Sequence, residues 1–143
     1  MRACIFCEIL TGNSPASLVY QDDVCLAFMD IQPVNPGHML LIPRQHADSL
    51  ANLPPETGGH LFQVGQRLAQ GLRLSGLPCE GVNLMLADGE AAGQDVFHVH
   101  LHIVPRFWQD GFGFTFPEKF WRKPPRAQLD TAAEKIRRAL SDG

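Results

Sequence analysis

The stretch His98-Val99-His100-Leu101-His102-Ile103-Val104 alternates imidazole and aliphatic side chains. Successive side chains of a β-strand point to opposite faces. The alternation therefore predicts a strand whose three histidines share one face while its aliphatic residues face the core. Three titratable rings in a partly buried row carry a desolvation cost, which favours a functional role for them over a structural one.

The spacing of this row argues against one metal ion bound by all three histidines. With a rise of about 3.3 Å per residue, the backbones of His98 and His102 lie about 13 Å apart, whereas zinc ligands bring their nitrogens to about 2.0–2.1 Å from the ion. A metal shared by two neighbouring histidines remains an alternative. The row is better suited to nucleophilic catalysis. In that interpretation His100 attacks a phosphorus, and His102 donates a hydrogen bond to a phosphate oxygen.

The segment before the histidine row is typical of an anion site. Gly89 and Gly93 permit close backbone approach and exposed N–H groups, and Gln94 offers an amide donor. A glycine loop alone is a weak signal, but its position beside three histidines strengthens it. Together they outline a site for a small anionic ligand.

Composition sets limits on the class of protein. The chain has 143 residues, is 45% hydrophobic and has a formal charge of −3, which favours one domain and argues against a nucleic-acid polymer as the ligand. The longest apolar stretches, such as Met39–Ile42, are far shorter than the ~20 residues of a membrane helix. No export signal is recognised, so we expect a cytoplasmic protein with reduced cysteines rather than disulfides.

The pattern along the chain predicts an α+β fold with an antiparallel sheet and helices on one side. The expected strands are 24–28, 38–42, 81–87 and 97–105. A helix after Pro54-Pro55 should bury an apolar stripe on the sheet until Gly76, and a second amphipathic helix should span about 129–140.

The histidine row resembles the signature of the histidine-triad (HIT) family, and the resemblance continues through three further segments. These are Cys4–Ile9, Leu26–Ile31 and Pro36–Pro43, with Ala92-Gly93-Gln94 before the histidines. The chain is most similar to the bacterial Hint-like branch. The resemblance implies a single HIT domain over 1–143, with about five strands, two main helices and a C-terminal tail and helix from about residue 116, pairing into a homodimer.

The resemblance also implies a purine nucleotide substrate cleaved at the α-phosphate through a nucleotidyl-histidine intermediate, with His100 as nucleophile and His102 and His38 beside it. Asp30 would accept from the ribose hydroxyls. The other expected nucleotide-binding residues are Ile5, Phe6, Ile9, Phe28, Ile31, Leu40, Gly93, Gln94 and Asp95.

Two positions depart from the family pattern and remove possible phosphate donors. Ala87 stands where an amide side chain is common, and Asp95 stands where a serine or threonine follows the Gly-Gln pair. An ionised Asp95 would repel a phosphate unless it turns away or orients a histidine. Because of these two departures, the sequence does not identify the leaving group of the substrate.

Cys4 and Cys7 form a Cys-x-x-Cys pair, which is typical of metal or redox chemistry. By resemblance to bacterial members, His46 and His98 complete a Cys₂His₂ set. Four protein ligands leave no open position, so such a zinc ion would be structural. No organic cofactor is expected.

The leading hypothesis is a nucleoside phosphoramidase or related nucleotidyl transferase. Three alternatives remain open: a dinucleoside polyphosphate hydrolase of the same family, a nucleotide-binding module without turnover, and a zinc hydrolase that uses two of the triad histidines.

Overall fold

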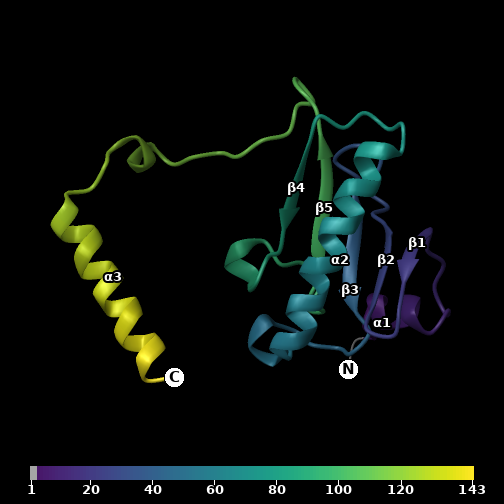
Figure 1. The fold of residues 1–143 in the computed structure, drawn as a ribbon, viewed down its shortest axis with the longest axis horizontal. Coiled ribbons are helices and arrows are strands. Elements are labelled where there is room, and N and C mark those ends of the chain that lie inside the picture. Colours follow the sequence, from purple (N-terminus) through teal and green to yellow (C-terminus); the bar gives the residue numbers. More distant parts are fainter. Residues whose placement is uncertain (1–2) are drawn as a thin grey trace. The chain divides into compact units, whose positions relative to one another are not determined.

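The computed structural model describes residues 3–143, and within them five strands form one antiparallel sheet accompanied by three α-helices (Figure 1). The strands are β1 (Leu18–Gln21), β2 (Cys25–Met29), β3 (Met39–Pro43), β4 (Gly81–Met85) and β5 (Leu101–Arg106). The helices are α1 (Ile5–Leu10), α2 (Pro55–Leu74) and α3 (Arg126–Ser141). The sheet order is β1-β2-β3-β5-β4, which confirms the predicted α+β class.

The larger core lies between the sheet and α2, which runs along one face of the sheet (Figure 1). Apolar residues recur along α2 at helical spacing and pack on inward-facing sheet residues. The buried members from α2 are Leu61, Val64, Leu68 and Leu72, and those from the histidine segment are Val99, Leu101 and Ile103. The aliphatic side chains of the alternating histidine stretch therefore point to the face covered by α2.

A second core covers the opposite face, which corrects the expectation of helices on one side only. Phe6 of α1 packs with Leu26, Phe28, Leu40 and Ile42, which alternate along β2 and β3 with the residues of the larger core. The short α1 lacks two helical turns of apolar repeat, so its periodicity did not reveal it. Its position matters because it lies on the face that carries the histidines.

Strand β5 begins at Leu101, four residues later than the sequence predicts, and a proline explains the difference. Leu101 pairs with Leu41 of β3, so continued pairing would place Val99 opposite Pro43, which has no N–H to donate. The Val99 N–H bonds instead to the carbonyl oxygen of Ala47 at 2.8 Å. Residues 98–100 are thus held beside the sheet rather than in its ladder.

The chain separates into two compact units, one ending at Phe112 and one spanning Gly113–Gly143. In the second unit, Phe116 stacks on Phe120 with ring centroids 4.1 Å apart, and Trp121 meets Phe120 edge-on at 5.1 Å. Helix α3 buries none of its residues, and Leu129, Ile136 and Leu140 of its apolar stripe are exposed. Across residues 3–143, no helix combines the length and apolar character needed to span a bilayer.

We expect the core beneath α2 to dominate stability. Replacing Leu41, which is 0% exposed, by alanine should lower the free energy of unfolding by about 2–5 kcal/mol, because the cavity cannot fully close. Leu74→Ala at the exposed end of α2 is the matched control and should change it by less than about 0.5 kcal/mol. Urea unfolding of both variants measures the difference, and equal effects would contradict this description of the core.

Candidate active site

The histidines share one face of the sheet, on the side of α1. The rings of His100 and His102 lie with centroids 5.0 Å apart, and Phe6 meets His100 edge-on at 5.2 Å and His98 at 5.8 Å. Val99, Leu101 and Ile103 belong to the core on the other face. The period-2 side-chain alternation therefore persists through the irregular backbone before β5.

His100 is held in one orientation by a backbone hydrogen bond. Its Nδ1 lies 2.8 Å from the carbonyl oxygen of His98, which can only accept, so Nδ1 carries the proton. The lone pair of the neutral ring then resides on Nε2. That nitrogen lies 3.6 Å from a carboxylate oxygen of Asp95, and His100 itself is buried. This is the protonation pattern that a nucleophilic imidazole requires.

His38 and His102 form a directed pair. The Val34 N–H donates to His38 Nδ1 at 3.0 Å, which leaves the His38 proton on Nε2. That Nε2–H lies 3.0 Å from Nδ1 of His102 and 3.4 Å from a carboxylate oxygen of Asp30. With its Nδ1 accepting, His102 carries its own proton on Nε2. The two rings thus form a chain that ends on a donor at the cavity.

Burial keeps these rings neutral. Desolvation lowers the pKa of His38 below its ordinary value of 6.5, although the charge of Asp30 opposes the shift. The pKa of His102 is lowered by desolvation first and then by the neighbouring His100 and His38. Neutral rings can act as donor and acceptor at the same time, which the chain of hydrogen bonds requires.

The histidine face opens into a cavity of about 270 Å³. Among the predicted nucleotide-binding residues, the lining includes Ile5, Phe6, Ile9, Phe28, Asp30, Ile31, Leu40, Asp95, His100 and His102. Pro15, Ala16, Met29, Gln32 and Val96 also line it. The segment before β1 and the residue after Asp95 carried no chemical motif in the sequence, so only the fold could identify them.

Gly93 and Gln94 do not line this cavity. The Gln94 amide donates to the carbonyl oxygens of Asp48 and Val96 at 2.8 and 3.1 Å, and its own oxygen accepts from the Gly89 N–H. Gly93 has a φ of 94°, a conformation that favours glycine. In this structure Gln94 therefore holds the loop before the histidines, and its amide is not a free donor as the sequence suggested.

Four predicted metal ligands, from three distant parts of the chain, come together. Cys4 Sγ lies 3.4 Å and Cys7 Sγ 3.7 Å from Nδ1 of His98, and Nδ1 of His46 lies 3.2 Å from that nitrogen. Nε2 of His98 donates to the carbonyl oxygen of Pro43 at 2.8 Å, which leaves its Nδ1 lone pair directed at the cluster. The arrangement fits zinc.

A second Cys/His/Asp group, Asp22, Cys25 and His60, was not anticipated and does not form a comparable site. His60 Nε2 lies 2.7 Å from the Asp22 carboxylate, which also accepts from Tyr20 and from two backbone N–H groups. Burial and Asp22 raise the pKa of Cys25 to about 12, so its thiol stays protonated. We interpret the group as a link between α2 and the turn before β2.

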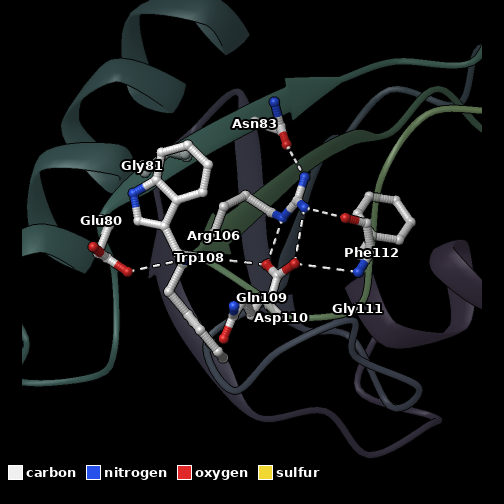
Figure 2. Close-up of a pocket in the computed structure, with 11 residues that line it drawn as sticks. Glu80, Gly81, Asn83, Arg106, Trp108, Gln109, Asp110, Gly111 and Phe112 are labelled. Atoms are coloured by element: carbon white, nitrogen blue, oxygen red, sulfur yellow. Dashed lines mark hydrogen bonds and ion pairs between the residues drawn. The ribbon is translucent and has the colours of Figure 1, made fainter.

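A larger cavity of about 510 Å³ lies where β4 begins and β5 ends, and its central charged groups, Arg106 and Asp110, are paired with each other (Figure 2). The Arg106 guanidinium makes a two-point ion pair with Asp110 at 2.7 and 2.9 Å and donates to Asn83 and Phe112. Asn35 donates to Asp110 at 2.9 Å and thereby ties the loop between Asp30 and His38 to the end of β5. This cluster therefore positions the histidine site.

Comparison with known proteins matches residues 11–109 to the model of the HIT domain. An adenylylsulfatase HINT3 of Arabidopsis thaliana is 36% identical over 75% of this chain and 54% of its own length. A zinc-bound histidine triad protein of Mycobacterium smegmatis is 42% identical, with a TM-score of 0.75 over 91% of this chain and 97% of its own. A histidine triad nucleotide-binding protein of Candida albicans has a TM-score of 0.85 at 30% identity, covering 98% and 99%.

We expect His38 and His102 to titrate below pH 6.5, the direction that their burial dictates. Since the unfolded chain takes up these protons at the ordinary pKa, the free energy of unfolding should fall as the pH drops below about 6.5. NMR titration of the imidazole signals, assigned with His38→Gln and His102→Gln, measures both midpoints. Midpoints at or above 6.5 would contradict the description of two desolvated rings.

Proposed function

Because the chain belongs to the histidine triad family of nucleotide hydrolases and transferases, we propose that it hydrolyses purine nucleoside phosphoramidates at the α-phosphate through a nucleotidyl-His100 intermediate. One observation carries the proposal. The hydrogen bond from Nδ1 of His100 to the His98 carbonyl leaves the lone pair on Nε2, and His100 lines the cavity.

In this proposal the nucleoside occupies the apolar part of the cavity. Ile5, Phe6, Phe28 and Leu40 offer an apolar surface for a purine base, and Asp30 accepts from the ribose hydroxyls. The α-phosphate then lies at the histidine end.

The proposed chemistry proceeds in two steps. Nε2 of His100 attacks the α-phosphorus, the P–N bond breaks, and the leaving nitrogen takes its electron pair together with the Nε2 proton of His102. Water then attacks the phosphorus of the intermediate and gives a proton back to His102, while the bond to His100 breaks. Amine and nucleoside monophosphate are the products.

His38 supports the proton exchange at His102. Its Nε2–H donates to His102 Nδ1, which keeps the His102 proton on Nε2, the position from which the leaving nitrogen takes it. The same contact bears on the alternative of a catalytic zinc ion. Such an ion would take its ligands from two triad histidines, and His102, whose Nδ1 accepts from His38 and whose Nε2 carries the proton, has no free lone pair to offer it.

Replacing His100 by alanine should reduce turnover of an adenosine phosphoramidate by at least about a thousandfold, because no other imidazole has its free nitrogen in this place. Nucleotide affinity should change little. Intact-protein mass spectrometry after rapid quenching should detect an AMP-sized adduct on the wild type alone. His60→Ala, outside the cavity, is the matched control and should retain turnover and adduct.

Turnover by His100→Ala at the wild-type rate would rule out this mechanism. Binding without turnover of phosphoramidates or dinucleoside polyphosphates would favour the binding module. A preference for the dinucleoside polyphosphates would favour the related hydrolase instead.

We also propose that Cys4, Cys7, His46 and His98 hold a structural zinc ion. Tetrahedral zinc with Zn–S near 2.3 Å and Zn–N near 2.0 Å separates its ligand atoms by roughly 3.3–3.8 Å. The four short separations in the cluster are 3.2–3.7 Å. The ion would fasten α1 to the segment that carries His100, and its four protein ligands leave no position for substrate.

The double substitution Cys4→Ser and Cys7→Ser should abolish zinc binding and lower the free energy of unfolding by about 3 kcal/mol or more, because the folded state loses its metal linkage. Cys79→Ser is the control, because this thiol lies outside the Cys/His cluster and donates to the carbonyl oxygen of Gly81. Metal analysis and thermal unfolding provide the readouts. Metal-free protein that stays folded should still form the His100 adduct, and loss of the adduct there would favour a catalytic ion.

Two further proposals concern the assembly and the location of the protein. We propose a homodimer, an association that would cover exposed apolar side chains such as Trp121 and Leu140. We propose a cytoplasmic location, since thiolate ligands require reduced cysteines. Nucleic-acid polymers and membranes are not proposed as partners.

A further inference from the structure

Asp95 is the carboxylate that lies beside His100 in the cavity lining. One of its oxygens lies 3.6 Å from Nε2 of His100, and the same oxygen accepts from the N–H of Val96 at 2.9 Å, which fixes the side chain toward the histidine. The side chain is nevertheless 82% exposed. It therefore borders both the reacting nitrogen and the solvent.

The cavity has a marked charge pattern. Its lining within residues 3–143 includes two carboxylates, Asp30 and Asp95, and no lysine or arginine. A bound α-phosphate therefore meets neutral imidazole donors and a carboxylate rather than a cation. Further negative charge on the substrate would add repulsion, whereas a positive group near Asp95 would offset it.

The leaving group is the part of the substrate that meets Asp95. In the proposed binding mode a nucleoside takes up the apolar wall of the cavity of about 270 Å³, and the group on the far side of the phosphorus would extend toward solvent. Asp95 stands at that exposed end, next to the nitrogen that attacks the phosphorus. Its negative charge would therefore interact electrostatically with the leaving group.

From this placement we propose that Asp95 is a specificity-determining residue that selects nucleoside phosphoramidates with cationic amine leaving groups and disfavours anionic ones. This selection rests on the proposed function, because it concerns the group that His100 displaces. Asp95 makes and breaks no bond in the two steps given above. Its effect is electrostatic.

Three adenosine 5′-phosphoramidates test the selection, with the nitrogen bearing an ethyl, a 2-aminoethyl or a 2-carboxyethyl group. All three break the same P–N bond and differ in the charge of the leaving group. A unit charge about 5 Å from Asp95 in water changes an equilibrium constant by roughly a factor of four. The wild-type kcat/KM for the cationic compound should therefore exceed that for the anionic compound by about tenfold.

Asp95→Asn keeps the shape of the side chain and removes its charge, so the ratio should fall to about twofold or less. Glu90→Gln is the matched control, because Glu90 is an exposed carboxylate of the same loop that does not line the cavity. This variant should keep the wild-type ratio. Raising the ionic strength to about 1 M, where the screening length is about 3 Å, should compress the wild-type ratio and leave that of Asp95→Asn nearly unchanged.

Failure of the selection and failure of the proposed function give different results. Equal kcat/KM values for the three compounds, or an unchanged ratio in Asp95→Asn, overturn the role of Asp95 and leave the phosphoramidase intact. If no compound is hydrolysed, the proposed function fails. The dissociation constants of the three compounds with His100→Ala then still test Asp95, since the order cationic, neutral, anionic should persist in binding and disappear when Asp95→Asn is added.

Discussion

The hydrogen bond from His100 Nδ1 to the carbonyl oxygen of His98 is the interaction on which the site depends. It assigns the proton within the imidazole ring and directs the opposite nitrogen toward the cavity. It also requires that the backbone at His98 be held firmly, although this residue lies outside the sheet ladder. Three separate contacts provide that support: Val99 bonds to Ala47, the His98 ring bonds to Pro43, and Phe6 packs against His98.

Pro43 links the fold to the chemistry. Because proline has no N–H to donate to a neighbouring strand, the pairing between β3 and β5 stops at Leu41 and Leu101. His98 and His100 therefore lie outside the sheet ladder. The carbonyl oxygen of the same proline accepts from His98 Nε2, which directs His98 Nδ1 at Cys4, Cys7 and His46. Pro43 thus ends a strand and sets the tautomer of His98, a proposed zinc ligand. The Cys/His cluster and His100, the proposed nucleophile, are consequently parts of one local structure.

The sequence predicted the local features well, because they depend on neighbouring residues. Alternation at His98–Val104 gave the shared face of the histidines, and the apolar stripe after Pro55 gave α2. The features that the sequence did not predict depend on tertiary contacts. The delayed start of β5 depends on the residue opposite Val99, the internal use of the Gln94 amide depends on Asp48, and the coverage of the second face by α1 depends on a helix too short to show a period. The His38–His102 pair was expected only through family resemblance.

The charges around the cavity bear on how tightly it would bind the product of the proposed reaction. Under the proposed function, the neutral, desolvated His102 ring would donate a hydrogen bond to a phosphate without the strong attraction of a lysine or arginine, so a nucleoside monophosphate product would be held weakly. In the proposed reaction Asp95 would weaken binding of this product further, because the monophosphate carries more negative charge than a phosphoramidate monoanion. A site that binds its product loosely avoids inhibition by it. The carboxylate that stands where a donor is common in the family therefore fits an enzyme that releases its product readily, and it need not mark a loss of catalysis.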